Sequence, residues 1–494
     1  MKQFTYKKRS FAMLAATLVL LSGCRILAPK SDNTGLGKSG GKNTSIGTSS
    51  SAASKAGEFP YYNSTVDFSS IPTEASKNTS SVKKGTASSK ASSGKSAATS
   101  TAKASSATSS STGSYTPIAH SEMKAMWISY LELNSNPRLL QDRSAELFRA
   151  NIAQAYDKCR SIGVNTVFVH VRPFGDAVYP SVLFPSSEAA TSTPGAKLSY
   201  DPLAIMIDEA HKKGISFHAW INPYRAQSAS KAEAIASKAP DTQFAKWYKD
   251  SSKKGDYLID LGGRYYYNPS VPEVRKLLVD GVEEILKNYQ VDGIHIDDYF
   301  YPSGIDANFD KAAYQRYLQG GGKLALADFR RDCNNQAVKG IYQKIKSINS
   351  KVVFSVSPSG NVSYNYTTMF ADVELWLKTE GYLDLIIPQI YYGFKNAAAP
   401  YSQTVATWNT MVKLPSIKMV VGLAAYKVGQ VEAAYTGAGI NEWIDDAGNI
   451  LASQIAQAKS QSHYAGYAFF DYKSLFYPEA AKSTMIQQEI SKLS

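Results

Sequence analysis

The chain has 494 residues, of which 44% are hydrophobic and 12% aromatic, which is enough apolar material for a large buried core. Its formal net charge of +13 is unevenly placed, because residues 1–120 contain 15 Lys/Arg and 4 Asp/Glu, whereas the rest of the chain contains 39 and 37. A nucleic-acid enzyme carries its basic excess on the folded domain, so the near-neutral remainder argues against nucleic acid as a partner.

Residues 1–24 have the pattern of a bacterial lipoprotein signal peptide. A basic start over residues 2–9 precedes an apolar run over residues 11–21, which is too short for a comfortable membrane span. The run ends in Leu21-Ser22-Gly23-Cys24, which resembles a lipobox and implies cleavage before Cys24 and lipidation of its thiol. A generic signal peptide with an incidental cysteine is the alternative. We therefore expect an extracytoplasmic protein that is lipid-anchored to the bacterial cell membrane through Cys24.

Residues 25–120 have the composition of a disordered tether. Ser, Thr, Ala, Gly and Lys dominate this segment, and it contains few large apolar residues, so burial cannot offset the entropy of ordering it. A flexible coil of about 90 residues has a root-mean-square span on the order of 50 Å. The tether is either a leash that carries the folded domain away from the membrane or a solubilising spacer.

From Met123 onward, short apolar runs alternate with amphipathic segments of helical period. The runs are Ala125–Ser129, Thr166–Arg172, Ser216–Asn222, Gly293–Asp298, Val352–Pro358, Asp384–Ile390, Met419–Ala425 and Gly466–Tyr472. The segments between them include Ala145–Ile162, Pro202–Lys213, Pro272–Tyr289 and Leu324–Ile348. Eight such units predict an α/β fold, a (β/α)8 TIM barrel over residues 121–494. An open doubly wound sheet is the alternative, but no glycine-rich phosphate loop follows the first run.

The cysteines of the barrel segment predict neither a disulfide nor a metal site. Cys159 and Cys333 lie in helical segments on opposite sides of the predicted barrel, which is too far apart for a bridge. The chain has no C-x-x-C pair of the kind used for zinc or redox chemistry. We expect both residues to be core thiols, and we expect no metal or other cofactor.

Polar and aromatic residues gather at the ends of the predicted strands, where the chemistry of a (β/α)8 barrel lies. The preceding halves of the same runs are almost entirely Val, Ile, Phe and Ala, and this asymmetry is typical of an active site. The residues that we expect to contact substrate are Arg172, Asp176, Trp220, Asn222, Tyr224, Arg225, His295, Tyr299, Tyr301, Gln389, Tyr391 and Asp471.

Four stretches at these positions resemble the glycosyl-hydrolase-like 10 family of bacterial lipoproteins. They are Val169–Pro180, Tyr200–Arg225, Asn268–Arg275 and Asp292–Pro302, and the likeness extends over roughly residues 121–490. The resemblance implies a barrel glycosidase. For at least some members of the family, it also implies action on peptidoglycan glycan strands from which the peptides have been removed.

The segment after the fourth run is also similar to the chitinase-type pattern D-G-x-D-x-D-x-E. Asp292, Gly293 and Asp297 match this pattern, whereas His295 replaces the first inner Asp and Tyr299 replaces the acidic Glu. These departures argue against a true chitinase-type enzyme. They leave Asp298 as the nearest replacement for the missing acid.

Asp297 and Asp298 are the predicted catalytic residues. Glycosidic cleavage needs an acid for the leaving oxygen and a group that stabilises an oxocarbenium-like centre. Alternation along a strand places Asp297 on the interior face with His295 and Tyr299, and Asp298 reaches the cleft where the chain turns. Two close carboxylates split their pKa values, so that one stays protonated near neutral pH. We expect Asp298 to be the general acid and Asp297 to have an orienting or polarising role. The alternative is that one of the two carboxylates only accepts hydrogen bonds from loop amides.

The sequence leaves the group opposite this pair open. Asp176, Glu188 and Asp471 are candidates, and each of them is also explained as a surface or loop carboxylate. An N-acetyl group on the substrate is the other candidate, because it can serve as internal nucleophile without a second carboxylate.

Two arginines and several aromatic residues are candidates for binding sugar. Arg172 and Arg225 close neighbouring strands and have the fork geometry for a carboxylate, such as the lactyl group of peptide-free muramic acid. An internal ion pair with Asp176 or Asp201 explains them equally well. Stacking platforms for sugar rings are expected from a set of aromatic residues, each of which has packing under a loop as its alternative. This set comprises Trp220, Tyr224, Tyr299, Tyr301, Tyr391 and Tyr472.

Two other functions compete with glycosidase activity. His170, His218 and His295 lie on consecutive strands and, with Asp297, have the residue types of a metal site in a metal-dependent polysaccharide hydrolase or deacetylase. A non-catalytic barrel that binds glycan without cutting it is the second alternative. The main expectation is a monomeric glycosidase whose partners are a cell-wall polysaccharide and, through Cys24, the membrane.

Overall fold

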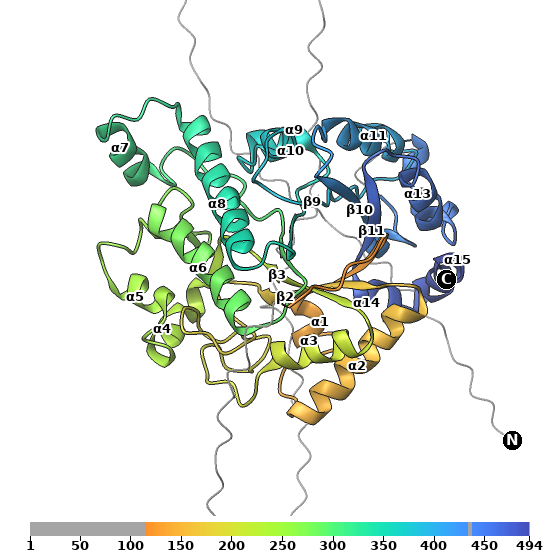
Figure 1. The fold of residues 1–494 in the computed structure, drawn as a ribbon, viewed down its shortest axis with the longest axis horizontal. Helices are drawn as coiled ribbons and strands as arrows, with labels where there is room; N and C mark the ends of the chain where they lie inside the picture. The colour runs from red at the N-terminus through yellow and green to blue at the C-terminus, as the bar shows by residue number, and fades with distance from the viewer. Residues whose placement is uncertain (1–114, 433–436, 494) are drawn as a thin grey trace, which may run out of the picture. The chain divides into compact units, whose positions relative to one another are not determined.

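The computed structural model of the protein describes residues 115–432 and 437–493. The predicted signal peptide, Cys24 and the tether as far as residue 114 lie outside the described residues. A closed barrel of eight parallel strands follows, in the order β1-β11-β10-β9-β8-β7-β3-β2 (Figure 1). The strands are β1 (Met123–Ile128), β2 (Thr166–Arg172), β3 (Ser216–Ile221), β7 (Gly293–Ile296), β8 (Val353–Val356), β9 (Leu385–Ile386), β10 (Lys418–Ala424) and β11 (Tyr464–Phe470). Each predicted apolar run contributes one strand, which confirms the (β/α)8 barrel.

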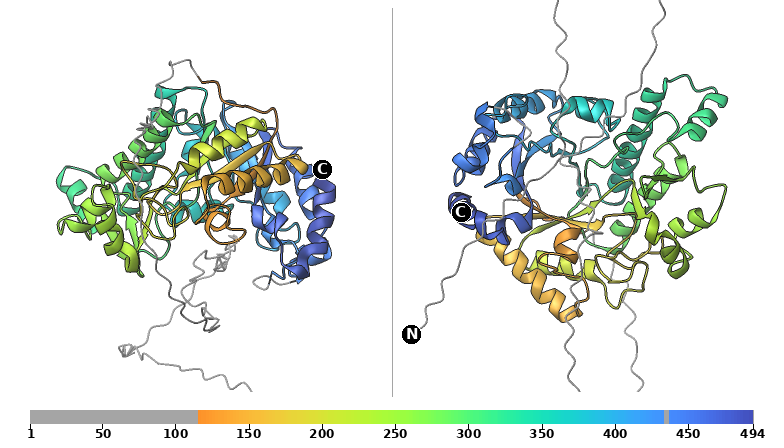
Figure 2. Two further views of the ribbon diagram at one scale, coloured as in Figure 1. Left: turned by 90° about the horizontal axis from the view of Figure 1, so that it is seen from below. Right: turned by 180° about the vertical axis from the view of Figure 1, so that it is seen from behind.

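Helices surround the strands in Figure 1 and in both views of Figure 2. The longer ones are α2 (Ala145–Ser161), α3 (Pro202–Lys212), α6 (Pro272–Asn288), α8 (Leu326–Ile348), α11 (Tyr401–Met411), α13 (Ile450–Ala458) and α15 (Ser483–Leu493). The shorter ones are α1 (Tyr130–Asn134), α4 (Ala229–Lys238), α5 (Gln243–Lys249), α7 (Lys311–Gln319), α9 (Val362–Thr367), α10 (Val373–Lys378), α12 (Glu442–Asp445) and α14 (Tyr472–Phe476). No helix in the described ranges is both long and apolar enough to cross a membrane.

The pattern of α6 shows why these segments form helices against the barrel. Pro272 occupies the first turn, where its fixed φ favours helix and its missing N–H removes no hydrogen bond. The buried residues recur every three or four positions, which places them on one stripe that faces the strands. They are Val274, Leu277, Leu278, Gly281, Val282 and Ile285.

The barrel encloses an apolar core of its own, separate from the larger core between strands and helices. Alternation along β2 explains the division, because Val167 and Val169 belong to the outer core and Phe168 belongs to the inner one. The inner core comprises Ala125, Trp127, Phe168, Trp220, Leu385, Ile387, Val420 and Ala468. The barrel is therefore filled below its carboxyl end, and the predicted core thiols Cys159 and Cys333 are buried and free, as expected.

Gly293 makes room for an imidazole inside the barrel. A Cβ at this position would lie 2.2 Å from Nδ1 of the buried His218. Because overpacking a tight core costs about 1–3 kcal/mol, we expect Gly293→Ala to lower the free energy of unfolding by about that amount. Chemical denaturation of both proteins measures this difference. Gly320→Ala, where a Cβ would come no closer than 3.4 Å, is the matched control. Equal stability of the two variants would contradict the packing argument.

Asp292 fastens the incoming chain to the amino end of the barrel. It accepts hydrogen bonds from the Tyr115 hydroxyl at 2.5 Å, the Ile118 amide at 2.6 Å and the Phe217 amide at 2.6 Å, and it lies 2.9 Å from Nε2 of His211. Burial raises the pKa of Asp292, but these hydrogen bonds outweigh burial and lower it. Asp292 precedes β7, so the described chain enters at the end of the barrel opposite the βα loops. Ordered contacts thus begin six residues before the expected domain start at residue 121.

A small antiparallel sheet lies beside the third barrel strand and was not predicted. Its strands run in the order β4-β6-β5 and are β4 (Arg225–Ser228), β6 (Arg264–Tyr267) and β5 (Leu258–Leu261). Gly262 and Gly263, both with positive φ, form the turn between β5 and β6. This sheet brings Arg264 and Tyr266 toward the residues that follow β3.

Candidate active site

Asp297 is a buried acceptor at the carboxyl end of β7. Its exposed fraction is 4%, and its Oδ2 accepts a hydrogen bond from Nε1 of Trp220 at 2.8 Å and a longer one from Nδ2 of Asn222 at 3.4 Å. The amide of Tyr299 donates to its Oδ1 at 3.3 Å. Two residues from β3 and the loop after it therefore hold this carboxyl, as the expected interior position required.

Asp298 is half-buried and lies where the chain turns. Strand β7 ends at Ile296, and the amide of Phe300 donates to the carbonyl oxygen of Asp298 at 2.9 Å, so the alternation of a strand no longer separates the two carboxyls. The side-chain amide of Gln389 and the positive charge of Arg225 both act to lower the pKa of Asp298. Solvent reaches this second carboxyl more readily than the first.

Burial and mutual repulsion keep a proton on this pair near neutral pH. Burial and, after it, the charge of Asp298 raise the pKa of Asp297 to about 7, against the opposing effect of the hydrogen bond from Trp220. Burial also raises the pKa of Asp298, against the effect of Gln389 and Arg225. Because the two carboxyls repel each other, their protons leave in separate steps that belong to the pair. In the unliganded protein Asp297 is the member that keeps the proton longer.

His295 forms the floor beneath the pair. It is fully buried, and its Nε2 accepts a hydrogen bond from Nε1 of Trp127 at 3.0 Å. Since an indole N–H only donates, Nδ1 of His295 carries the hydrogen and donates to the Ser355 hydroxyl at 2.8 Å. Burial holds the pKa of His295 well below its usual range. The ring is therefore a neutral support. We call the carboxyl end of the barrel around Asp297 and Asp298 the mouth. His295 was expected to touch substrate there, but the structure places its ring below the mouth.

His170 supports the donor that serves Asp297. Its ring stacks on Trp220 at a centroid distance of 3.8 Å with 4° between the planes, which fixes the orientation of the indole. The third histidine, His218, packs against Gly293, and burial lowers its pKa to about 4. Both nitrogens of His295 are already engaged, and no cluster of three or more His, Cys, Asp or Glu within the described residues is placed to hold a metal. The donor geometry thus gives no support to the metal-dependent alternative.

One side of the mouth is cationic and aromatic. The guanidinium carbon of Arg225 lies 4.5 Å from the ring centroid of Phe174 and 4.4 Å from that of Tyr299. The guanidinium carbon of Arg264 lies 4.9 Å from the same Phe174 ring. Tyr130 packs edge-on against Phe174 at 4.7 Å. Of these residues only Arg225 and Tyr299 were expected at the site.

The other side of the mouth is aromatic. Tyr391 packs against Tyr426 at a centroid distance of 5.8 Å and against Phe470 at 5.9 Å, and all three are half-buried. The charge of Asp298 contributes to a raised pKa of Tyr391, after the larger effect of burial, which places this ring within reach of the acidic pair. Gln389 and Tyr391 thus lie near Asp298 at the carboxyl end of the barrel.

Several other expected site residues lie outside the mouth. Arg172 is 1% exposed and stacks over the Phe184 ring at 3.7 Å on the outer side of the barrel wall, against α6. Tyr224 is buried in the outer core. Tyr301 is fully buried with Phe309 and Phe370 in a separate cluster, and its hydroxyl pairs with Ser270 at 2.7 Å. Tyr472, a proposed stacking platform, is likewise buried. The three tyrosines are therefore packing residues, which is the alternative given for them, and Arg172 packs against a helix.

The three carboxylates proposed to oppose the pair have other partners. Asp176 accepts a hydrogen bond from the Phe174 amide at 2.8 Å within its own loop, and burial raises its pKa to about 6. Glu188 pairs with Lys231 at 2.5 Å. Asp471 caps α14 by accepting from the Ser474 amide at 3.0 Å. The ion pair of Arg172 or Arg225 with Asp176 or Asp201 does not form within the described residues.

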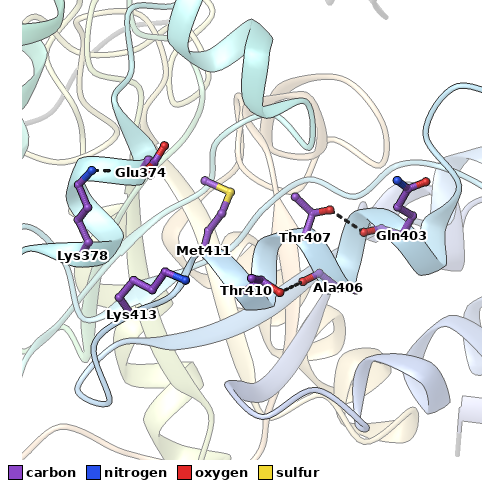
Figure 3. Close-up of a pocket in the computed structure, with 8 residues that line it drawn as sticks. All are labelled: Glu374, Lys378, Gln403, Ala406, Thr407, Thr410, Met411 and Lys413. Carbon is purple, nitrogen blue, oxygen red and sulfur yellow. Dashed lines mark hydrogen bonds and ion pairs between the residues drawn. The ribbon is translucent and has the colours of Figure 1, made fainter. Parts of the chain in front are cut away.

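Two cavities on the described chain lie away from the acidic pair. One of about 440 Å³ lies on the flank formed by α10 and α11, where Lys378 pairs with Glu374 at 3.3 Å (Figure 3). The other, of about 240 Å³, lies between the loop at Asp142 and the segment that leads into α3. Access to the acidic pair follows instead from the partial exposure of the residues around it, which are Asp298, Tyr299, Gln389, Tyr391 and Phe470.

A closed (β/α)8 barrel with a proton-holding carboxylate pair and aromatic walls at its carboxyl end defines a barrel of the glycoside hydrolase type. The chain belongs to the glycosyl hydrolase-like 10 family, whose sequence pattern matches residues 122–436.

Two relatives and one solved structure illustrate the likeness. "Glycosyl hydrolase YngK" from Bacillus subtilis (strain 168) is 36% identical over 327 residues, which cover 62% of this chain and 61% of that protein. "Glycosyl hydrolase DigH" from Shigella flexneri is 34% identical over 331 residues, which cover 62% of this chain and 74% of that protein. The match therefore spans less than two thirds of the Bacillus protein. The glycoside hydrolase domain of PgaB (BpsB) from Bordetella bronchiseptica covers 74% of this chain and is itself covered to 98%, at 13% identity and a TM-score of 0.44.

Proposed function

We propose that this protein is an extracytoplasmic glycoside hydrolase, anchored by lipid at Cys24, that cleaves peptidoglycan glycan strands stripped of their peptides. The observation that carries the catalytic part is the pair of the buried Asp297 and the half-buried Asp298, both of whose pKa values are raised. Membership of the glycosyl hydrolase-like 10 family supports glycosidic bonds as the target and a polysaccharide as the substrate. The lipobox-like segment before Cys24 supports the anchor.

In this proposal Asp298 gives the proton to the leaving oxygen. It is the more exposed member of the pair, so substrate that covers the mouth removes water from Asp298 and leaves the surroundings of Asp297 unchanged. Loss of water raises the pKa of Asp298 relative to that of Asp297, and the shared proton moves to the carboxyl that faces the sugar. Asp297, held by Trp220, then carries the negative charge that stabilises the oxocarbenium-like centre.

The partner group in this mechanism is the N-acetyl oxygen of the substrate. Asp176, Glu188 and Asp471 are engaged in loop, surface and helix-cap contacts, which favours an internal nucleophile over a second protein carboxylate. An amino-sugar polymer supplies such a group. The alternative of a barrel that binds glycan without cutting it remains an outcome of the test.

Digestion of purified sacculi tests the proposal. The protein without its signal segment is incubated with sacculi stripped by an amidase, with peptide-bearing sacculi and with chitin, and the released sugars are identified by mass. We expect products with a reducing end from the stripped sacculi. Anhydro-sugar products would instead indicate that the strands are cleaved by lytic transglycosylation and not by hydrolysis. Binding without release would favour the non-catalytic barrel, and release from chitin alone would contradict the proposed substrate.

A further inference from the structure

Arg225 and Arg264 form a pair of cations that no described carboxylate approaches within ion-pair distance, although the charge of Asp297 acts on Arg225 from further away. Their guanidinium carbons lie 4.5 Å and 4.9 Å from the centroid of one Phe174 ring. After burial, the charge of Arg225 is the largest influence that lowers the pKa of Arg264, so the two groups repel each other. Neither guanidinium is paired with a carboxylate or other acceptor of the chain over residues 115–432 and 437–493. Such an arrangement is stabilised by an anion from outside.

Arg225 and Arg264 differ from Arg172 in the surroundings of their guanidinium groups. Buried nitrogens of Arg172 lack partners, and its guanidinium lies in the outer core over Phe184. The side-chain nitrogens of Arg225 and Arg264 are not among the sealed, unpartnered atoms of the described chain. Arg264 is half-buried on β6 and Arg225 is 7% exposed, so Arg264 carries most of the contact of this cationic pair with solvent.

The cationic pair adjoins the catalytic carboxyls. The charge of Arg225 acts on both Asp297 and Asp298, and Tyr299, which directly follows them, stacks against the same guanidinium at 4.4 Å. An anion held by Arg225 and Arg264 therefore belongs to a sugar within or next to the unit that is cleaved. Phe174 and Tyr299 offer aromatic surface for that sugar.

We propose that Arg225 and Arg264 bind the carboxylate of an acidic sugar and thereby select glycan strands whose lactyl carboxylates are free. This inference rests on the proposed function, because it names the groups that give the same site its substrate preference. A peptide joined to the lactyl group converts the carboxylate into a neutral amide, which removes the ionised acceptor that an arginine fork requires. Stripped strands offer the two cations a lactyl carboxylate, and peptide-bearing strands do not.

A substrate pair that differs only in charge tests this inference. Stripped glycan strands are compared with the same strands after carbodiimide coupling of methylamine to their lactyl carboxyls. We measure kcat and KM for the native chain, and for Arg264→Gln, Arg225→Lys and the exposed control Arg160→Gln on α2. Since hydrogen bonds to charged groups contribute about 1.5–3 kcal/mol, Arg264→Gln is expected to raise KM for the acidic strands about 10- to 100-fold and to leave KM for the amidated strands unchanged.

Arg225→Lys keeps the charge and removes the planar fork, so it should reduce the preference for acidic strands while the fold is retained. Equal cleavage of acidic and amidated strands by the native chain would overturn the inference and leave the proposed function standing. An equal loss on both substrates in Arg264→Gln would overturn it as well. Binding of acidic and of amidated strands to Asp298→Asn is measured in parallel. If the native chain cleaves neither kind of strand, the proposed hydrolase activity fails. The binding subsite is still supported in that case if only the acidic strands bind and if their binding depends on Arg264.

Discussion

Replacement of Asp298 by Asn is expected to lower kcat for cleavage of stripped glycan strands by about 100- to 10,000-fold, the range that positioned proton transfer contributes. The amide has the size of the carboxyl, but it cannot give a proton to the leaving oxygen. Binding of strands should change little, because the arginines and aromatic rings of the mouth remain in place. Sugar release and sacculus co-sedimentation measure the two effects.

Asp241→Asn is the matched control for this variant. Asp241 is exposed and lies outside the barrel mouth, so the same change of charge at that position should leave kcat unaltered. An Asp298→Asn protein that keeps more than a tenth of the native kcat would remove Asp298 from the role of general acid. A variant that fails both to bind and to cleave would indicate a disturbed mouth, which circular dichroism and thermal unfolding distinguish from lost chemistry.

Replacement of Asp297 by Asn is expected to abolish activity and to stabilise the fold at alkaline pH. Burial gives this carboxyl a folded-state pKa of about 7, above its ordinary value of 3.8. A group with a raised pKa contributes its full stability below about pH 4, and that contribution is lost as the pH rises through about 7. At pH 8 the buried charge costs up to about 4 kcal/mol, at about 1.4 kcal/mol per pKa unit.

The neutral Asn avoids this cost and can still accept the hydrogen bond from Trp220. We therefore expect Asp297→Asn to raise the free energy of unfolding by about 2–4 kcal/mol at pH 8 and by almost nothing at pH 4. Denaturant titrations of both proteins at the two pH values give the comparison, with Asp241→Asn again as control. A stability difference that does not depend on pH would contradict the assigned protonation of Asp297.

The barrel could be predicted because long stretches of the sequence show the residue types and periods of its strands and helices. Runs such as Thr166–Arg172 are apolar and β-branched, and amphipathic segments such as Pro272–Tyr289 have a helical period, so alternation of the two left little choice of architecture. Strand ends were less predictable. The fourth run was expected to reach Asp298, but strand β7 ends at Ile296, because the carboxyl pair turns out of the ladder.

The acidic pair also follows from the sequence, whereas Trp220 was expected to stack on sugar and instead donates a hydrogen bond to Asp297 from the neighbouring strand. Arg172 illustrates the limit. A register shift between His170 and Arg172 turns that side chain away from the barrel axis, and nothing in the local sequence predicts it. Arg264 was missed for another reason: it belongs to a hairpin whose Gly262-Gly263 turn between short strands is a recognisable signal that the barrel pattern obscured.

The pH dependence of kcat/KM on stripped glycan strands tests most directly whether the acidic pair does the chemistry. We expect a rate that falls as the pH rises through about 7, where the pair loses its last proton. A rate that stays constant from slightly acidic to clearly alkaline pH would contradict a catalytic proton shared by Asp297 and Asp298.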